Sequence, residues 1–125
     1  MNCLFRVNAI VAAALIVISP ITAPANPRSH PLNEDAALEL LQRTLKRDGV
    51  YEKRISMGCV EYGTEETTKS YFEFVLREIH NAKCGGDPVM SHVLDRYRVY
   101  RRSGKIEQYE VAQDEWHAYK GAHTK

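Results

Sequence analysis

The stretch Ser-Tyr-Phe-Glu-Phe-Val-Leu-Arg-Glu-Ile-His, residues 70–80, decides the fold because it has the clearest pattern in the chain. Phe72, Phe74 and Leu76 alternate with polar residues such as Glu73. In a β-strand, successive side chains point to opposite faces, so residues two apart share a face. An apolar residue at every second position therefore indicates a strand with one face packed against a core. We therefore expect residues 70–80 to form the central strand of a sheet.

Two cysteines flank this stretch, Cys59 before it and Cys84 after it. The third cysteine, Cys3, lies in the predicted leader, so the exported chain would keep an even number. An even count in an oxidising compartment favours a Cys59–Cys84 disulfide. Adding His80 and His92 does not reproduce a zinc-binding spacing, and we expect neither a metal nor a cofactor.

The first 25 residues resemble a secretory signal peptide. Arg6 is followed by an apolar run over residues 9–18, which is too short to span a bilayer, and by Ala-Pro-Ala at residues 23–25. We expect cleavage after Ala25 and no membrane span in the mature protein. A retained anchor, the alternative, requires a longer apolar segment. The predicted location is the periplasm or the extracellular space.

Charge and length limit the class of the exported protein. Removing residues 1–25 takes away Arg6 and no acidic residue, so the mature chain has 16 basic and 16 acidic residues. A near-neutral chain lacks the basic excess of a general nucleic-acid binder. The remaining length suits a single domain. We predict an arm at residues 26–32, the domain at residues 33–120 and a flexible tail at residues 121–125.

Residues 33–49 carry the signals of an amphipathic helix. Asn33 is a suitable N-cap, acidic residues fill the first turn, and Gly49 suits the position after the C-cap. Apolar residues recur at helical spacing and form one stripe. The stripe comprises Ala37, Leu38, Leu41 and Leu45.

The rest of the chain is predicted to form strands, at residues 53–62, 70–80, 89–102 and 105–112. Residues 63–66 and the Gly-Gly-Asp-Pro segment within residues 81–88 have loop composition. Of the two loops weighed for the last hairpin, we prefer the three-residue loop at 102–104. It has Gly104 left-handed and sets Tyr97 opposite Tyr109. Trp116 and Tyr119 are expected to fold back onto the sheet edge.

The predicted fold is therefore α+β, with one N-terminal helix packed on a four-stranded antiparallel meander in a single domain. This element order, over residues 33–119, resembles the cystatin-like group of folds. The inhibitory Gln-x-Val-x-Gly motif of cystatins does not occur in the sequence. Inhibition of cysteine proteases is therefore not implied by the resemblance.

Catalytic patterns are weak in this sequence. No serine lies in a Gly-x-Ser-x-Gly elbow, and the acidic pairs at residues 65–66 and 114–115 fall at predicted turns or strand ends. His80 and His92 are the histidines expected to be held in place, and they could flank the Cys84 loop as an acid and base pair. We do not expect this protein to be an enzyme. If it is an enzyme, the His80 and His92 pair is the candidate catalytic site.

Basic and aromatic residues concentrate in the last hairpin. Such residues anchor protein interfaces, although cross-strand ion pairing with the acidic residues that follow is the alternative. The candidate partner-binding residues are Arg96, Arg98, Tyr100, Arg101, Arg102 and Lys105.

Function is expected from these surfaces rather than from catalysis. The leading hypothesis is an exported protein-binding module, an inhibitor or immunity-type protein that neutralises an enzyme or toxin. This hypothesis is supported by analogy, because small exported single-domain proteins with one disulfide and no catalytic residues often inhibit or neutralise an enzyme. The alternatives are a binder of a small ligand or anionic saccharide in the hollow between helix and sheet, and an enzyme that uses His80 and His92.

Overall fold

The computed structural model describes residues 30–121. The predicted signal peptide, residues 26–29 of the predicted arm and residues 122–125 of the tail lie outside this part. One helix and a five-stranded antiparallel sheet form a single α+β domain, with strand order β1-β2-β3-β4-β5. The elements are α1 (Glu34–Arg47), a 3-10 helix (Met57–Cys59), β1 (Val60–Thr67), β2 (Tyr71–Glu78), β3 (Val93–Tyr100), β4 (Ile106–Glu110) and β5 (Glu115–Ala118). The prediction of four strands was wrong, because residues 115–118 add a fifth.

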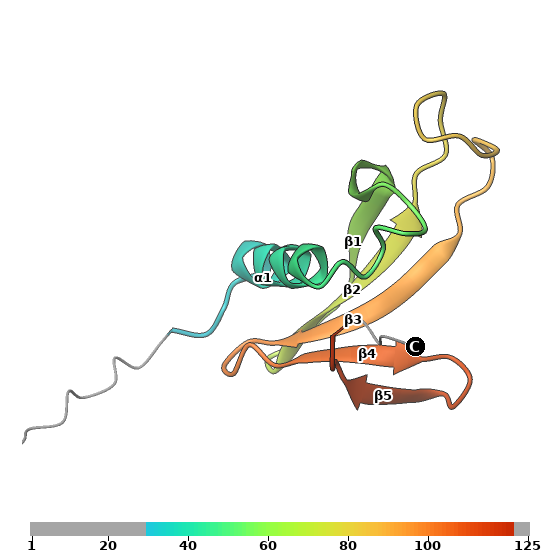
Figure 1. Cartoon of the computed structure of the whole chain (residues 1–125). Coiled ribbons are helices and arrows are strands. Elements are labelled where there is room, and N and C mark those ends of the chain that lie inside the picture. The colour runs from blue at the N-terminus through green and yellow to red at the C-terminus, as the bar shows by residue number, and fades with distance from the viewer. Residues whose placement is uncertain (1–29, 122–125) are drawn as a thin grey trace, which may run out of the picture.

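Helix α1 begins and ends where the sequence signals predict. The Asn33 side chain accepts a hydrogen bond of 2.8 Å from the Ala36 N–H, and Gly49 has a φ of 61° just after the helix. Ala37, Leu41 and Leu45 are fully buried. Figure 1 shows α1 lying across one face of the sheet, and its apolar stripe packs on β2 and β3.

Strand β2 supplies the core face that the alternation of residues 70–80 predicts. Phe72, Phe74 and Leu76 are buried in the cluster that includes the α1 stripe. The strand is an interior one, between β1 and β3. With five strands, however, β3 occupies the middle of the sheet, which corrects the expectation that residues 70–80 form its central strand.

The first strand begins later than predicted. Residues 51–56 form turns held by local bonds, such as the one of 3.0 Å from the Ile55 N–H to the Tyr51 carbonyl. The apolar residues that alternate with polar ones in this segment pack on the core from a turn and not from a strand. Residues 63–66, predicted as a turn, belong to β1, and the chain reverses instead where the Thr68 hydroxyl accepts from the Tyr71 N–H at 2.9 Å.

Residues 101–105 connect β3 to β4, and because the Tyr100 N–H donates to the Lys105 carbonyl at 2.9 Å, the turn itself has four residues, 101–104, rather than three. Gly104 is left-handed as predicted, with a φ of 67°, and its N–H donates to the Tyr100 carbonyl at 2.8 Å. Tyr97 pairs with Gln108, not with Tyr109. This register places Ile106 beside Val99 and against the core, and it moves Tyr109 to the opposite face.

A polar network fills the space between the segment after α1 and the sheet. The Tyr51 hydroxyl donates to the Asp95 carboxylate and lies 2.9 Å from the Tyr97 hydroxyl, while the Gln108 amide donates to Asp95 at 3.1 Å. Burial raises the pKa of both tyrosines. Because Tyr51 and Tyr97 are almost fully buried, this part of the hollow is occupied by core side chains.

Candidate functional site

The face of the sheet opposite α1 carries a cluster of aromatic and charged side chains centred on Arg98. Along β2 and β3, the residues between the core positions point to this open face. The Arg98 guanidinium carbon lies 4.4 Å from the centroid of the Tyr71 ring and 3.9 Å from that of Trp116. Its Nε donates to the Glu73 carboxylate at 3.0 Å. Arg98 is therefore held between two rings and one carboxylate.

More aromatic rings continue the cluster on both sides of Arg98. The centroids of Tyr71 and Tyr100 are 5.8 Å apart, and those of Tyr109 and Trp116 are 5.3 Å apart. All four rings are half-buried. We call this set the aromatic–arginine surface, and it comprises Tyr71, Glu73, Arg96, Arg98, Tyr100, Glu107, Tyr109 and Trp116.

Ion pairs fix most of the cations on and beside this surface. The Arg96 Nε donates to Glu65 of β1 at 2.7 Å, whereas the alternative of cross-strand ion pairing predicts partners among the acidic residues that follow on the next strand. Lys105 pairs with Glu107 at 2.7 Å, but these residues are two positions apart along the chain and do not form a cross-strand pair. Burial alone would raise the pKa of Glu107, but hydrogen bonds from Lys105 and Tyr100 outweigh it and lower that pKa.

The structure divides the predicted partner-binding residues into three groups. Arg96, Arg98 and Tyr100 lie on the open face. Arg102 and Lys105 are exposed on the hairpin loop. Arg101 is occupied within the fold. Its guanidinium donates to the carbonyls of residues 32 and 68 at 3.2 Å each, and lies over the Phe72 ring.

Several residues of the surface were missing from the predicted site. The same alternation that assigned Glu73 to the second face of β2 also assigns Tyr71, so this residue could have been found. Trp116 and Tyr109 could not have been assigned to the surface from the sequence. Their place beside Arg98 depends on the fifth strand and on the β3–β4 register, and neither follows from a local pattern.

The second predicted locus, at the Cys84 loop, does bring its residues together. Cys59 and Cys84 form a disulfide-compatible pair with Cα atoms 5.6 Å apart, as predicted. The rings of His80 and His92 have centroids 5.6 Å apart. Within residues 30–121 there is no group of three or more His, Cys, Asp or Glu side chains that could hold a metal ion.

Both nitrogens of the His80 ring are occupied. Nε2 lies 2.9 Å from the Glu78 carboxylate, and Nδ1 lies 3.0 Å from the Asp87 carbonyl. Both partners are acceptors when Glu78 is ionised, so the arrangement suits an imidazolium that donates from both nitrogens. The hydrogen bond to Glu78 is the main cause that raises the pKa of His80. This ring is better placed to fasten a loop than to accept a proton from a substrate.

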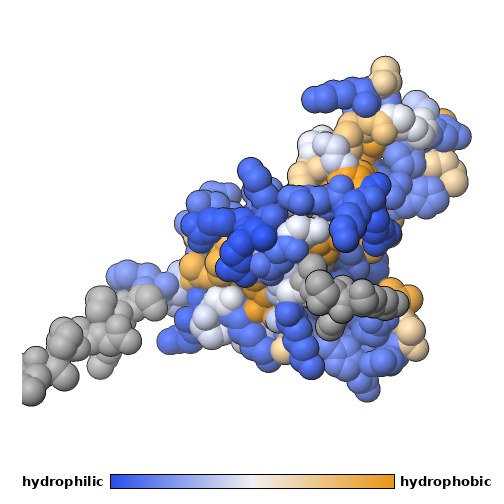
Figure 2. Space-filling model, viewed as in Figure 1, coloured by the Kyte–Doolittle hydropathy of each residue, from blue (hydrophilic) through white to orange (hydrophobic). Residues whose placement is uncertain are grey.

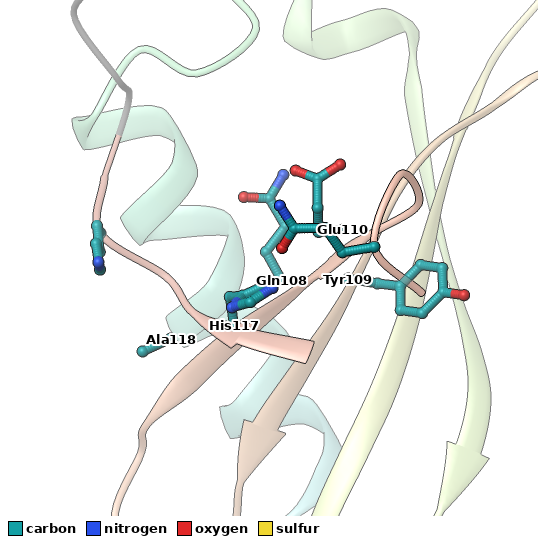
Figure 3. Close-up of a pocket in the computed structure, with 7 residues that line it drawn as sticks. Gln108, Tyr109, Glu110, His117 and Ala118 are labelled. Carbon is teal, nitrogen blue, oxygen red and sulfur yellow. The ribbon is translucent and has the colours of Figure 1, made fainter. Parts of the chain in front are cut away.

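A shallow pocket of about 430 Å³ lies over β4 and β5. Figure 3 shows it with Gln108 and Glu110 on one side of β4, and Tyr109 directed away from them. Its other lining residues are Gln113, His117, Ala118 and Lys120. The pocket is polar and open, and it lies at the end of the sheet rather than between α1 and the core strands.

Comparisons with protein-family models, curated proteins and solved structures gave no match. Among residues 30–121, no helix combines the length and the apolar character needed to cross a membrane. Function is therefore inferred from the surfaces described above.

Proposed function

We propose that this chain is an exported protein-binding module of the inhibitor or immunity type, which neutralises an enzyme or toxin in the periplasm or outside the cell. The observation that carries the proposal is Arg98, held between Tyr71 and Trp116 on a sheet face that α1 leaves open. The sequence pattern of residues 1–25 and the Cys59–Cys84 pair support export.

The chemistry of the open face suits a protein partner. Arg, Tyr and Trp are the residues that most often dominate binding energy at protein interfaces. Arg98 and the rings beside it already have fixed contacts, so binding would immobilise few further rotamers and the entropic cost would be small. Because Arg96 and Arg98 are paired with carboxylates, the face offers planar stacking and directed hydrogen bonds rather than a bare positive charge.

The layout of α1 on a meander sheet also leads us to retain the cystatin-like grouping as a proposal about fold. The proposal concerns the arrangement of elements alone. Since the sequence lacks the Gln-x-Val-x-Gly hairpin motif, the partner need not be a cysteine protease, and the open face replaces that hairpin as the suggested contact.

The test combines crosslinking in cells with binding by purified proteins. A photo-crosslinking residue, p-benzoylphenylalanine, replaces Tyr109 on the open face or, as control, Arg43 on the exposed side of α1. We expect a discrete protein adduct from position 109 and none from position 43. The adduct is identified by mass spectrometry, and that protein is then purified and titrated.

The titration uses Arg98→Lys, which keeps the charge but loses the planar group, and Arg43→Lys as the matched control. Arg98→Lys should weaken binding about tenfold, as expected for a residue at a binding hot spot, while Arg43→Lys should leave it unchanged. Addition of the wild-type chain should also reduce the partner's activity. Equal affinities for the two variants, or no adduct from position 109, would contradict the proposal.

A binder of a small ligand or anionic saccharide is the second candidate, and the polar pocket over β4 and β5 favours it. Lys120 and His117 could contact an anionic group there, and Gln108 and Gln113 could bind hydroxyl groups. Isothermal titration with anionic oligosaccharides, comparing wild type with Lys120→Glu, separates this candidate from the first. Saturable binding that Lys120→Glu removes would favour it.

A further inference from the structure

The loop between β2 and β3 carries an unusual concentration of exposed apolar side chains. Four large apolar residues are exposed among residues 30–121, and three of them lie within residues 89–93. Val89 is 91% exposed and Met90 is 50% exposed. Figure 1 shows this loop extending beyond the ends of β2 and β3, and Figure 2 shows apolar residues on the projecting part.

The first half of this loop is held rigidly in spite of its projection. The Asn81 side-chain oxygen accepts from the N–H groups of Lys83 and Cys84, each at 2.9 Å. The Asn81 carbonyl accepts from the Gly85 N–H at 2.7 Å. Cys84 is in turn joined to Cys59, the last residue of the 3-10 helix that precedes β1. The first half of the loop is therefore closed on itself by Asn81 and tied to the rest of the domain through Cys84.

The second half is held by His80 and Asp87. The Asp87 carbonyl lies 3.0 Å from His80 Nδ1 and also accepts from the Met90 N–H at 2.9 Å. The Asp87 carboxylate accepts from the Val89 N–H at 3.0 Å. The backbone that presents Val89 and Met90 is therefore set before any partner is bound.

We propose that this loop is a second contact element, which inserts Val89 and Met90 into an apolar pocket of the protein partner. The inference rests on the proposed function. Apolar side chains held in water are stabilised when a partner buries them, and a loop already ordered loses little entropy on binding. Together these properties suit a rigid loop that enters a cavity of the partner, such as the cleft of an enzyme.

A protein pocket fits the loop better than a bilayer surface. Within residues 81–92 the charge of Asp87 balances that of Lys83, so the loop lacks the cluster of basic residues by which proteins bind anionic lipid headgroups. The loop offers two adjacent apolar side chains rather than the broad apolar face by which amphipathic segments bind membranes. Two apolar side chains on an ordered loop are small enough to enter a pocket of a protein partner.

The experiment compares Val89→Asp with Val111→Asp. Val111 is a matched control because it is 77% exposed on the β4–β5 turn and has the same side chain. The partner used is the protein that crosslinks to position 109 on the open face. Val89→Asp should weaken its binding about tenfold, as expected when a charge replaces a buried anchor, and Val111→Asp should not. In addition, p-benzoylphenylalanine at position 89 should crosslink to the same partner.

The outcomes separate this inference from the proposed function. If Arg98→Lys weakens binding and Val89→Asp does not, the loop is not a contact element, although the proposed function stands. If neither position 89 nor position 109 yields a protein adduct, both fail. Binding of wild type to vesicles of equal phosphatidylethanolamine and phosphatidylglycerol, lost in Val89→Asp, would overturn the inference in favour of a membrane contact.

Discussion

The Arg98 guanidinium stacks on Trp116, although these residues belong to β3 and β5, which are separated in the sheet by β4. Arg98 reaches across the neighbouring strand, and its Nε remains bonded to Glu73 of β2. One side chain therefore connects three strands on the open face. This contact gives the short fifth strand a second attachment, besides its backbone bonds to β4.

Removing the Arg98 side chain should destabilise the domain. Arg98→Ala removes the stacking on two rings and leaves Glu73, which is only 9% exposed, without its partner. We expect a loss of about 2 kcal/mol in the free energy of unfolding, measured by urea denaturation. Combining Arg98→Ala with Glu73→Gln should restore part of it. Additive losses in this double-mutant cycle would show that the two residues are not coupled.

Arg101 and Arg102 are adjacent but should respond differently to substitution. Arg101 donates to two backbone carbonyls and covers Phe72, whereas Arg102 is exposed. Arg101→Ala should lower the free energy of unfolding by about 1–3 kcal/mol, and Arg102→Ala by less than about 0.5 kcal/mol. Chemical denaturation of the two variants in parallel provides the check. A similar loss for both would mean that the Arg101 contacts contribute little.

Reduction of the Cys59–Cys84 pair should weaken the whole domain. The pair closes a loop with a sequence separation of 25 residues, for which chain entropy predicts a contribution of about 3 kcal/mol. The Cys59→Ser/Cys84→Ser variant should lose a similar amount in urea denaturation. Mass measurement after alkylation without reductant tests the bond itself, because two alkylated thiols in the mature protein would refute it.

The attachment of the 81–92 loop should depend on pH through His80. Its pKa is raised above the ordinary value of 6.5, chiefly by the hydrogen bond to Glu78 and next by the one to the Asp87 carbonyl. The proton is thus held more tightly in the folded state. The resulting stability is fully present below about pH 6.5 and is lost as the pH rises through the folded pKa.

NMR titration of the His80 ring checks this pH dependence, with hydrogen exchange of the Met90 amide as a report on the loop. We expect a midpoint above that of a free histidine and, relative to the base-catalysed intrinsic exchange rate, weaker protection of the Met90 amide at high pH. His80→Gln is the control, because glutamine does not titrate and its loop exchange should lack this transition. A His80 midpoint below 6.5 would contradict the predicted shift.

Two adjacent glycines allow the packing on His80 to be measured separately from backbone strain. Gly85 and Gly86 have φ values of 77° and 79°, so alanine at either position costs about 1–2 kcal/mol. A Cβ at Gly85 meets open space, while one at Gly86 would lie 2.7 Å from the His80 ring. Gly86→Ala should therefore be the more destabilising variant by thermal unfolding. Equal melting temperatures would show that the ring moves aside without cost.

Local patterns predicted much of the fold. The helix was set by its N-cap, its stripe and Gly49, and β2 by the alternation of Phe72, Phe74 and Leu76. Each of these signals depends on the few neighbouring residues that the chain places on one face. The prediction that the first strand, over residues 53–62, begins before residue 60 was wrong for the same reason. Ile55 and Met57 alternate with polar residues, but turns also place such side chains against a core.

The sequence by itself determined the α+β class, the antiparallel meander, the candidate Cys59–Cys84 pair and the basic residues of the last hairpin. Tertiary structure alone decided which of these residues share a surface. A shift of one residue in the β3–β4 register exchanges the faces of β4, and it was packing of Ile106 on the core that selected the register with Tyr109 outward. Pairing of β5 with β4 then brought Trp116 to Arg98. The aromatic–arginine surface exists because contacts distant in sequence fixed both choices.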